Sequence, residues 1–300
     1  MKHYTVAWGD HRLTLGPRTL VMGIVNVTPD SFSDGGRFLG RDDAIAQGLR
    51  LMDEGADILD IGGESTRPFS DPVSAEEELR RVIPVIEALA RRGTVPISID
   101  TTKSDVAREA VAAGASIIND VSALRVDPAM ADVAVQYDVP IILMHMLGTP
   151  KTMQTDPEYD DVVAAVCAFL RQAVQKAVQA GIDARRIIVD PGIGFGKTFA
   201  HNLQLLHHLK ALQEVDCPIL VGSSRKAFIR HLLKPPGEKD IRADLPVVAT
   251  GTQATVAASA LQGAHIVRVH EVADTRATLK IIEAIRNADA GSSGYAQGDA

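Results

Sequence analysis

A regular alternation of short apolar runs with longer helical patterns is the feature of this 300-residue chain that most constrains its fold. The runs are short and rich in β-branched residues, which favours strands over helices. Between them, apolar residues recur every three or four positions, as in 45–52 and 163–177, which is typical of helices with one buried face. The runs predicted as strands are Leu20–Val27, Ile58–Ile61, Pro96–Ile99, Ser116–Val121, Pro140–Met146, Ile187–Val189, Pro218–Val221 and His265–Val269.

The boundaries between helix and strand also repeat. Gly55, Gly114 and Gly263 are each followed by Ala where a helix must end, and Gly181 is a looser fourth copy. Glycine readily takes the left-handed backbone that ends a helix. Eight such units favour an α/β fold, a closed (β/α)8 TIM barrel. An open doubly wound sheet is the alternative.

Three segments divide the chain. Residues 1–18 are predicted to form an N-terminal β-hairpin extension and residues 19–287 the barrel. Residues 288–300 are small and polar and are expected to form a disordered tail. The stretch 234–246, "KPPGEKDIRADLP", is interpreted as a surface insertion.

Composition excludes several classes of partner. A formal charge of -7 has the wrong sign for a surface that gathers nucleic acid or anionic lipid. The chain has no apolar stretch of the roughly 20 residues that span a membrane, and its start does not resemble a signal peptide. We therefore expect a cytoplasmic protein that binds neither nucleic acid nor membrane. Cys167 and Cys217 are interpreted as core thiols.

Polar residues end all eight predicted strands. In a TIM barrel the carboxyl ends of the strands meet at the mouth, where active sites lie. Asn26, Asp100, Asn119 and Asp190 stand at or beside such ends. Singly, each could cap a helix or pair with an Arg in the core. Acids and amides at nearly every end are better explained by a site at the mouth.

Two kinds of recognition are suggested by these residues. Arg268 and His270 are two apart on one strand and share a face, which predicts an anion pocket. Asp100, Asn119 and Asp190 offer carboxylate and amide groups that match the edge of a flat, amino-substituted nitrogen heterocycle.

The stretch "GIGFGKT", residues 192–198, resembles a nucleotide-binding loop only superficially. The phosphate-loop pattern needs Gly four places before the Gly-Lys pair, where this chain has Pro191. Phe195 within it is expected to lie against a ring or to pack in the core.

Together, eight stretches resemble one family, the dihydropteroate synthases of folate synthesis, which are the target of sulfonamides. They occur in the family's order and span residues 22–272. The stretches are "MGIVNVTPDSFSDGG", "DIGGESTRP", "ISIDTTK", "IINDVSA", "MHMLGTPKTMQ", "DPGIGFGK", "GSSRKAF" and "GAHIVRVHEV".

The resemblance implies a transferase that joins a pterin methylene to the amino group of 4-aminobenzoate and releases diphosphate. It also implies Mg²⁺ as cofactor and a homodimer. Magnesium would neutralise the diphosphate and improve it as a leaving group. The pterin-methylene cation left behind would be stabilised by carboxylates around the ring.

The resemblance further implies a role for each site residue. Asn26 would be the metal ligand. The pterin diphosphate would be bound by Thr66, Asp100, Asn119, Met144, Asp190, Phe195, Lys226, Arg268 and His270. The 4-aminobenzoate cleft would be formed by Phe32, Arg67, Pro68, Phe195 and Ala227. Catalytic roles would fall to Asn26, Asp100, Lys226, Arg268 and His270.

Two loops are similar to the family's mobile lids. "NVTPDSFSDGG", residues 26–36, would close over the pterin diphosphate, with Asn26 and Asp34 serving the metal and the phosphates. Residues 62–74 would be its partner. One departure concerns Ala227, where many family members have Ser, so the contact with the aminobenzoate carboxylate would differ.

Three rival functions stay open. Methyltetrahydrofolate:corrinoid methyltransferases use a related pterin-binding barrel but bind no diphosphate, which "STRP" and "GSSRK" argue against. A non-catalytic paralogue would bind a pterin without turnover. A barrel whose acids only cap helices would survive replacement of Asp100 with its ligand binding unchanged.

Overall fold

The computed structural model describes residues 1–27, 37–65, 70–93, 95–149 and 151–288, and for residues 37–39 only the backbone. Its core is a parallel sheet of eight strands in the order β8-β7-β6-β5-β4-β3-β10-β9. A parallel bridge between Val189 and Ile219 joins the two ends of this order, so the sheet closes on itself. The predicted TIM barrel is therefore confirmed, and the open sheet is excluded.

All eight predicted strands form, with ends shifted by a few residues. They are β3 (Leu20–Asn26), β4 (Ile58–Gly62), β5 (Ile97–Asp100), β6 (Ile117–Asp120), β7 (Ile141–Met144), β8 (Ile187–Asp190), β9 (Leu220–Val221) and β10 (Ile266–Val269). Most of their residues are fully buried, because the barrel interior covers one face and the helices the other.

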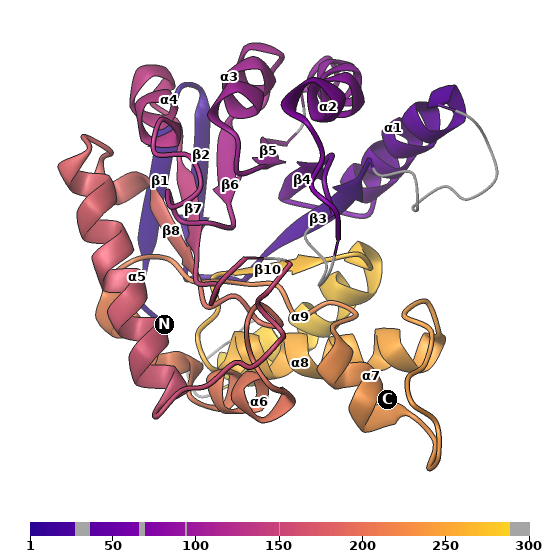
Figure 1. The fold of residues 1–300 in the computed structure, drawn as a ribbon. Helices are drawn as coiled ribbons and strands as arrows, with labels where there is room; N and C mark the ends of the chain where they lie inside the picture. The colour runs from indigo at the N-terminus through magenta and orange to yellow at the C-terminus, as the bar shows by residue number, and fades with distance from the viewer. Residues whose placement is uncertain (28–36, 66–69, 94, 150, 289–300) are drawn as a thin grey trace.

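Helices lie around the barrel and connect its strands (Figure 1). They are α1 (Arg37–Asp53), α2 (Ala75–Ala90), α3 (Ser104–Ala112), α4 (Met130–Tyr137), α5 (Val162–Gln179), α6 (Phe199–His207), α7 (Ala227–Leu233), α8 (Pro246–Leu261) and α9 (Val272–Arg286). Two short 3-10 helices, η2 (Ala184–Arg186) and η3 (Leu209–Val215), precede β8 and β9.

The repeated glycines end helices as predicted. Gly55, Gly114, Gly181 and Gly263 have φ of +93°, +118°, +100° and +100°. A side chain is unfavourable in this left-handed region, so glycine both stops each helix and turns the chain into the next strand.

The N-terminal extension is an antiparallel hairpin of β1 (Tyr4–Trp8) and β2 (His11–Leu15). Val6 and Leu15 are fully buried. The hairpin lies at the amino ends of the strands, because the backbone oxygen of Lys2 is 3.0 Å from Nε2 of His265, the residue before β10. It therefore closes the end of the barrel opposite the mouth.

The remaining expectations about the fold have mixed outcomes. Cys167 and Cys217 are buried free thiols, as expected. The insertion after α7 is mostly exposed, but its last residue, Pro246, begins α8. The expected tail lies outside the described residues from 289 onward. In the described part of the chain, no helix is both long and apolar enough to cross a membrane.

Candidate active site at the barrel mouth

A small cavity of about 20 Å³ lies at the carboxyl ends of the strands. Seven of the predicted site residues line it: Asp100, Asn119, Met144, Asp190, Phe195, Lys226 and Arg268. They come from β5, β6, β7, β8, β10 and the loops after β8 and β9. The volume has room for about one water molecule. This volume is far smaller than a fused heterocycle.

Arg268 forms ion pairs with two carboxylates inside this site. Its Nε donates to Oδ2 of Asp60 at 2.6 Å, and its Nη2 donates to Oδ2 of Asp100 at 2.7 Å. The amide of Asn119 also donates to Oδ2 of Asp60, at 3.0 Å. Paired carboxylates compensate the burial of this guanidinium. Four strands are thereby connected by one polar network.

Two carboxylate oxygens in the network remain without a partner. Among the described residues, Oδ1 of Asp60 and Oδ1 of Asp100 are buried and make no hydrogen bond. A buried acceptor without a donor is unfavourable and indicates a place for water or for a ligand with N–H groups. Asp100 lines the cavity, whereas Asp60 does not.

Burial raises the pKa of Asp100 to about 7, although Arg268 opposes the shift. Burial also raises the pKa of Asp190 to about 6, opposed first by a hydrogen bond from the backbone. That bond is donated by the N–H of Gly192 to Oδ1 of Asp190 at 2.6 Å. Perturbed carboxylates grouped in a cavity are typical of functional sites.

The loop after β8 is held from inside by Lys197. This side chain is 2% exposed, and its Nζ lies 2.9 Å from the backbone oxygens of Gly192 and Phe195 and from Nδ1 of His145. Burial lowers the pKa of Lys197 to about 7 and that of His145 to about 2. Lys197 therefore organises the protein's own backbone, which agrees with rejecting a phosphate-loop interpretation.

Phe195 and Lys226 form one wall of the cavity. The ammonium of Lys226 lies 4.0 Å from the centroid of the Phe195 ring, within the range of a cation–π interaction. Phe195 and Met144 also belong to a small apolar cluster with Val121, Met146 and Met153. Gly194 makes room for the lysine, because a Cβ there would lie 2.9 Å from Cδ of Lys226.

The other predicted residues lie around this cavity or outside the described residues. Asn26 ends β3, Ala227 begins α7, and His270 follows β10, with its Nδ1 2.8 Å from Oγ of Ser224. None of these three lines the cavity. Phe32, Asp34, Thr66, Arg67 and Pro68 lie outside the described residues, as do residues 28–36 of the first expected lid and residues 66–69 of the second.

Asp60 and Lys197 were given no role by the sequence prediction, although Asp60 was among the polar residues at the predicted strand ends. Asp60 is at the centre of the network, but the sequence gives only an acid in an apolar run, with no sign of its partners. Lys197 lies in a stretch whose pattern drew attention to phosphate binding. A fully buried lysine is rare enough that only the structure identifies it.

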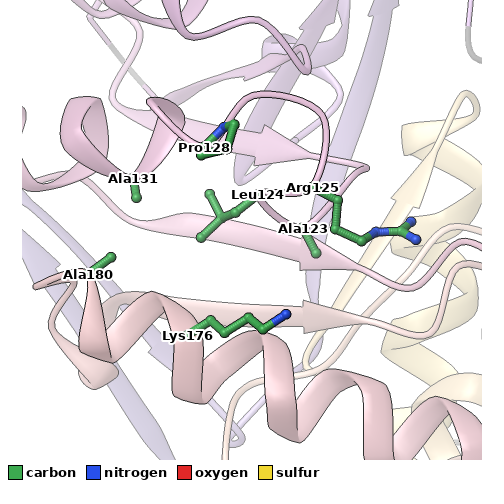
Figure 2. Close-up of a pocket in the computed structure, with 7 residues that line it drawn as sticks. All are labelled: Ala123, Leu124, Arg125, Pro128, Ala131, Lys176 and Ala180. Carbon is green, nitrogen blue, oxygen red and sulfur yellow. The ribbon is translucent and has the colours of Figure 1, made fainter.

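A larger cavity, about 320 Å³, lies away from these residues on the flank between α4 and α5 (Figure 2). It is lined by Ala123, Leu124, Arg125, Pro128, Ala131, Lys176 and Ala180. The Arg125 guanidinium is bonded to the backbone oxygens of Ser122 and Met146. Because the cavity offers so few polar groups, we locate the site at the smaller one, where the carboxylates gather.

Asn26 is the candidate ligand for magnesium. Within the described ranges, no three His, Cys, Asp or Glu residues are grouped to hold a metal ion. Asn26 is half-buried at the carboxyl end of β3, and its amide oxygen is a hard ligand suited to Mg²⁺. Magnesium commonly takes one or two protein ligands and completes its shell with water and substrate phosphates. The donor chemistry therefore fits.

Comparison with known proteins identifies the family. The model of the family described as pterin binding enzyme matches residues 22–270. Dihydropteroate synthase of Escherichia coli strain K12 is 46% identical over 269 residues, which cover 89% of this chain and 92% of that protein.

Solved structures agree with the sequence relatives. Xanthomonas albilineans dihydropteroate synthase with 4-aminobenzoic acid has a TM-score of 0.84 and 48% identity, and the match covers 95% of this chain and 99% of that one. The same enzyme in complex with 7,8-dihydropteroate has a TM-score of 0.81 and 48% identity, with coverage of 92% and 97%. The chain therefore belongs to the dihydropteroate synthases, within the family of pterin-binding enzymes.

Proposed function

We propose that the chain condenses (7,8-dihydropterin-6-yl)methyl diphosphate with 4-aminobenzoate to give 7,8-dihydropteroate and diphosphate. The aniline nitrogen attacks the methylene carbon, the bond from this carbon to the diphosphate oxygen breaks, and the nitrogen loses a proton. The observation that carries the proposal is the grouping of Asp100, Asn119, Asp190 and Lys226 around one cavity, with a buried oxygen of Asp100 unpaired.

The site recognises the pterin through hydrogen bonds to the polar edge of its ring. Ionised Asp100 and Asp190 accept N–H bonds from the amino-substituted ring, and Asn119 both donates and accepts. Met144 and Phe195, which share an apolar cluster, cover the ring faces. Entry of the ring moves Lys226 or Arg268, since the cavity between them is far smaller than a pterin.

The carboxylates also favour departure of the diphosphate. As the bond to the diphosphate breaks, positive charge spreads from the methylene into the pterin ring. Asp100 and Asp190 lie in a buried environment, where a negative charge stabilises a nearby cation more than it does in water. The amine then attacks with little help from a base, so a catalytic triad is not required.

The diphosphate is held by Arg268, His270 and Thr66. A guanidinium has five N–H groups, and the bonds of Arg268 to Asp60 and Asp100 use two of them. Arg268 therefore has N–H groups for a phosphate oxygen while it remains paired with Asp60. Asn26 holds Mg²⁺, which supplies charge neutralisation for the leaving diphosphate.

The 4-aminobenzoate cleft is formed by Phe32, Arg67, Pro68, Phe195 and Ala227. Of these, Phe195 has its ring centroid 4.0 Å from the ammonium of Lys226, and Ala227 follows Lys226 in the chain. Ala227 is exposed at the first position of α7 and provides only a methyl group toward the carboxylate of this substrate.

A homodimer and a cytoplasmic location complete the proposal. Eight exposed large apolar side chains lie on the consecutive helices α6 to α9: Phe199, Leu203, Leu232, Leu233, Val247, Leu261, Ile281 and Ile285. Contiguous apolar surface marks association sites, and α6, α7 and α9 each contact α8, so we infer that these side chains share a face that binds a second copy. Light scattering should give twice the 32.0 kDa mass of one chain.

Turnover by the purified chain tests the proposed function. The chain is incubated with the pterin diphosphate, MgCl₂ and 4-aminobenzoate, and both dihydropteroate and diphosphate are followed. Product that needs all three additions supports the proposal. Pterin binding without product favours the non-catalytic paralogue, and neither binding nor product rejects the assignment.

A further inference from the structure

We propose that Ser224 is a positioning residue for His270, whose imidazole it holds as the tautomer with hydrogen on Nε2. The inference rests on the proposed function, which assigns His270 to the diphosphate pocket. It concerns a residue outside the predicted site set, on the loop between β9 and α7.

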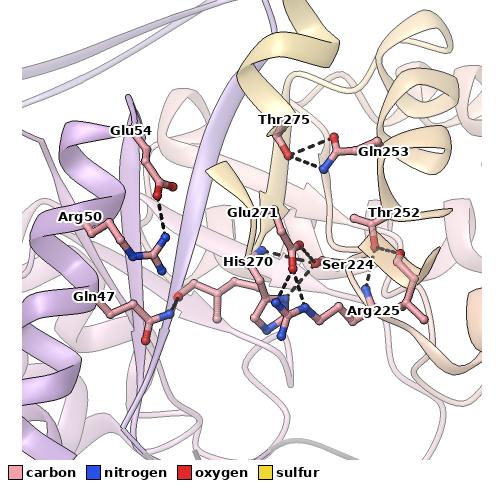
Figure 3. Close-up of polar contacts among 12 residues, drawn as sticks. Gln47, Arg50, Glu54, Ser224, Arg225, Thr252, Gln253, His270, Glu271 and Thr275 are labelled. Carbon is pink, nitrogen blue, oxygen red and sulfur yellow. Dashed lines mark hydrogen bonds and ion pairs between the residues drawn. The ribbon is translucent and has the colours of Figure 1, made fainter. Parts of the chain in front are cut away.

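Ser224 and His270 come from neighbouring strands. The two residues follow β9 and β10, which pair in parallel. Oγ of Ser224 lies 2.8 Å from Nδ1 of His270, and it accepts the backbone N–H of His270 at 3.3 Å. Figure 3 shows Ser224 beside His270 and Glu271, with dashed lines that mark its hydrogen bonds to them. One hydroxyl therefore contacts both the ring and the backbone of the same histidine.

Counting hydrogens assigns the tautomer. A serine hydroxyl has one hydrogen to donate, and the bond from the backbone of His270 already uses one of its acceptor positions. The two acceptors for that hydrogen are Nδ1 of His270 at 2.8 Å and Oε2 of Glu271 at 3.5 Å. The shorter contact is the stronger hydrogen bond. Nδ1 then accepts, and the hydrogen of a neutral imidazole is on Nε2.

An ion pair keeps the serine in place. Nε of Arg225 donates to Oε1 of Glu271 at 2.6 Å, and Nη2 of Arg225 contacts the same oxygen. Arg225 has a left-handed backbone with φ of +58°, held by its N–H to Oγ1 of Thr252 at 3.1 Å and by Arg230 to its backbone oxygen at 3.0 Å. The loop that carries Ser224 is thus held through the side chain of Arg225 and through both backbone polar groups of that residue.

The tautomer matters because diphosphate is an anion. A neutral imidazole with hydrogen on Nε2 donates a bond to a phosphate oxygen, whereas the other tautomer presents a lone pair and repels it. Loss of the hydrogen-bond partner that fixes the tautomer of a metal-ligating histidine typically costs about 10- to 100-fold in metal affinity or activity, and Ser224 contacts His270 in the corresponding way. We expect loss of the Ser224 hydroxyl to lower kcat about tenfold, the lower end of that range.

The adjacent serine provides a matched control. Oγ of Ser223 lies 2.8 Å from Oγ1 of Thr255 on α8, so its hydroxyl contacts a helix and not His270. Ser224→Ala should lower kcat about tenfold and leave the KM for 4-aminobenzoate unchanged, and Ser224→Thr should restore most of the rate. Ser223→Ala should stay within about twofold of the parent. Equal rates for the two alanine variants would overturn the proposal.

Nitrogen NMR of the imidazole tests the tautomer without turnover. Spectra at about pH 8.5, roughly two units above the ordinary imidazole pKa, report the neutral ring. The His270 signal is assigned by its loss in His270→Gln. The parent should show hydrogen on Nε2, and Ser224→Ala should show a mixture. Hydrogen on Nδ1 in the parent would overturn the proposal. The predicted spectra without any turnover would reject the proposed function and leave the role of Ser224 supported.

Discussion

Replacement of Asp100 by Asn should separate pterin binding from stability. The substitution keeps the shape of the side chain and removes its charge. Arg268 retains its 2.6 Å bond to Asp60, so no buried cation is left without a carboxylate. A pterin, by contrast, loses the ionised acceptor that faces the cavity.

The size of the binding effect follows from the strength of a charge-assisted hydrogen bond. Such a bond contributes about 1.5–3 kcal/mol. At about 1.4 kcal/mol per tenfold change, the Kd for the pterin diphosphate should rise about 10- to 100-fold. Titration calorimetry without 4-aminobenzoate measures this Kd directly, because the condensation cannot proceed without the second substrate.

The free energy of unfolding of the parent protein should fall as pH rises through the titration of Asp100. Burial raises the pKa of Asp100 from 3.8 to about 7, so the folded protein holds a proton that the unfolded chain has released. Ionisation of Asp100 therefore lowers the free energy of unfolding as pH rises from about 4 to about 7. Asp100→Asn lacks this loss, and its stability relative to the parent should increase over that interval in urea titrations.

Asp120→Asn is the matched control. Asp120 ends β6, the strand that pairs with the one ending at Asp100. Asp120 accepts backbone N–H bonds from Ser122 and Leu124 at 2.8 and 2.7 Å and does not line the cavity. Its replacement should lower stability and leave pterin affinity within about twofold. Unchanged pterin affinity in Asp100→Asn, or equal losses in both variants, would refute the site.

Four further predictions follow from the same geometry. Lys197→Met removes the donor to two backbone oxygens. The free energy of unfolding, measured in urea titrations, should fall by about 3 kcal/mol, whereas a fall below about 0.5 kcal/mol would show that the buried bonds contribute little. Gly194→Ala adds a Cβ 2.9 Å from Cδ of Lys226 at a φ of +85°, so calorimetry should find weaker pterin binding, and unchanged affinity would contradict the packing. Burial raises the pKa of Asp100 to about 7 and that of Asp190 to about 6, and the pterin needs both in the ionised form. Affinity should therefore fall as pH drops below about 7, by up to about tenfold per unit, and more steeply below about 6, and a flat profile from about pH 8 to about pH 5 would exclude these roles. Ala227→Ser restores a hydroxyl beside Lys226 and should lower the KM for 4-aminobenzoate, while an unchanged KM would place that carboxylate elsewhere.

The sequence predicted the barrel well because its signals are local. Each β-branched run and each terminal glycine, such as Gly55 or Gly263, is set by neighbouring residues, and eight repeats leave few topologies. Strand ends also mark the mouth, which is why Asp100, Asn119 and Asp190 could be named.

Partners across the barrel could not be predicted in the same way. Asp60 and Arg268 are separated by 208 residues, and nothing in either stretch indicates their bond. The contact of Ser224 with His270 likewise depends on the pairing of β9 with β10. Such contacts depend on strand order and register, which a single sequence does not specify.

A crystal structure of the chain with 7,8-dihydropteroate would test the central claim most directly. The account predicts the pterin ring at the mouth, with N–H groups on Oδ1 of Asp100 and on Asp190, Met144 and Phe195 against its faces, and Lys226 or Arg268 moved from the positions that now leave only about 20 Å³. A ring bound elsewhere, for example between α4 and α5 with these carboxylates still unpaired, would contradict it.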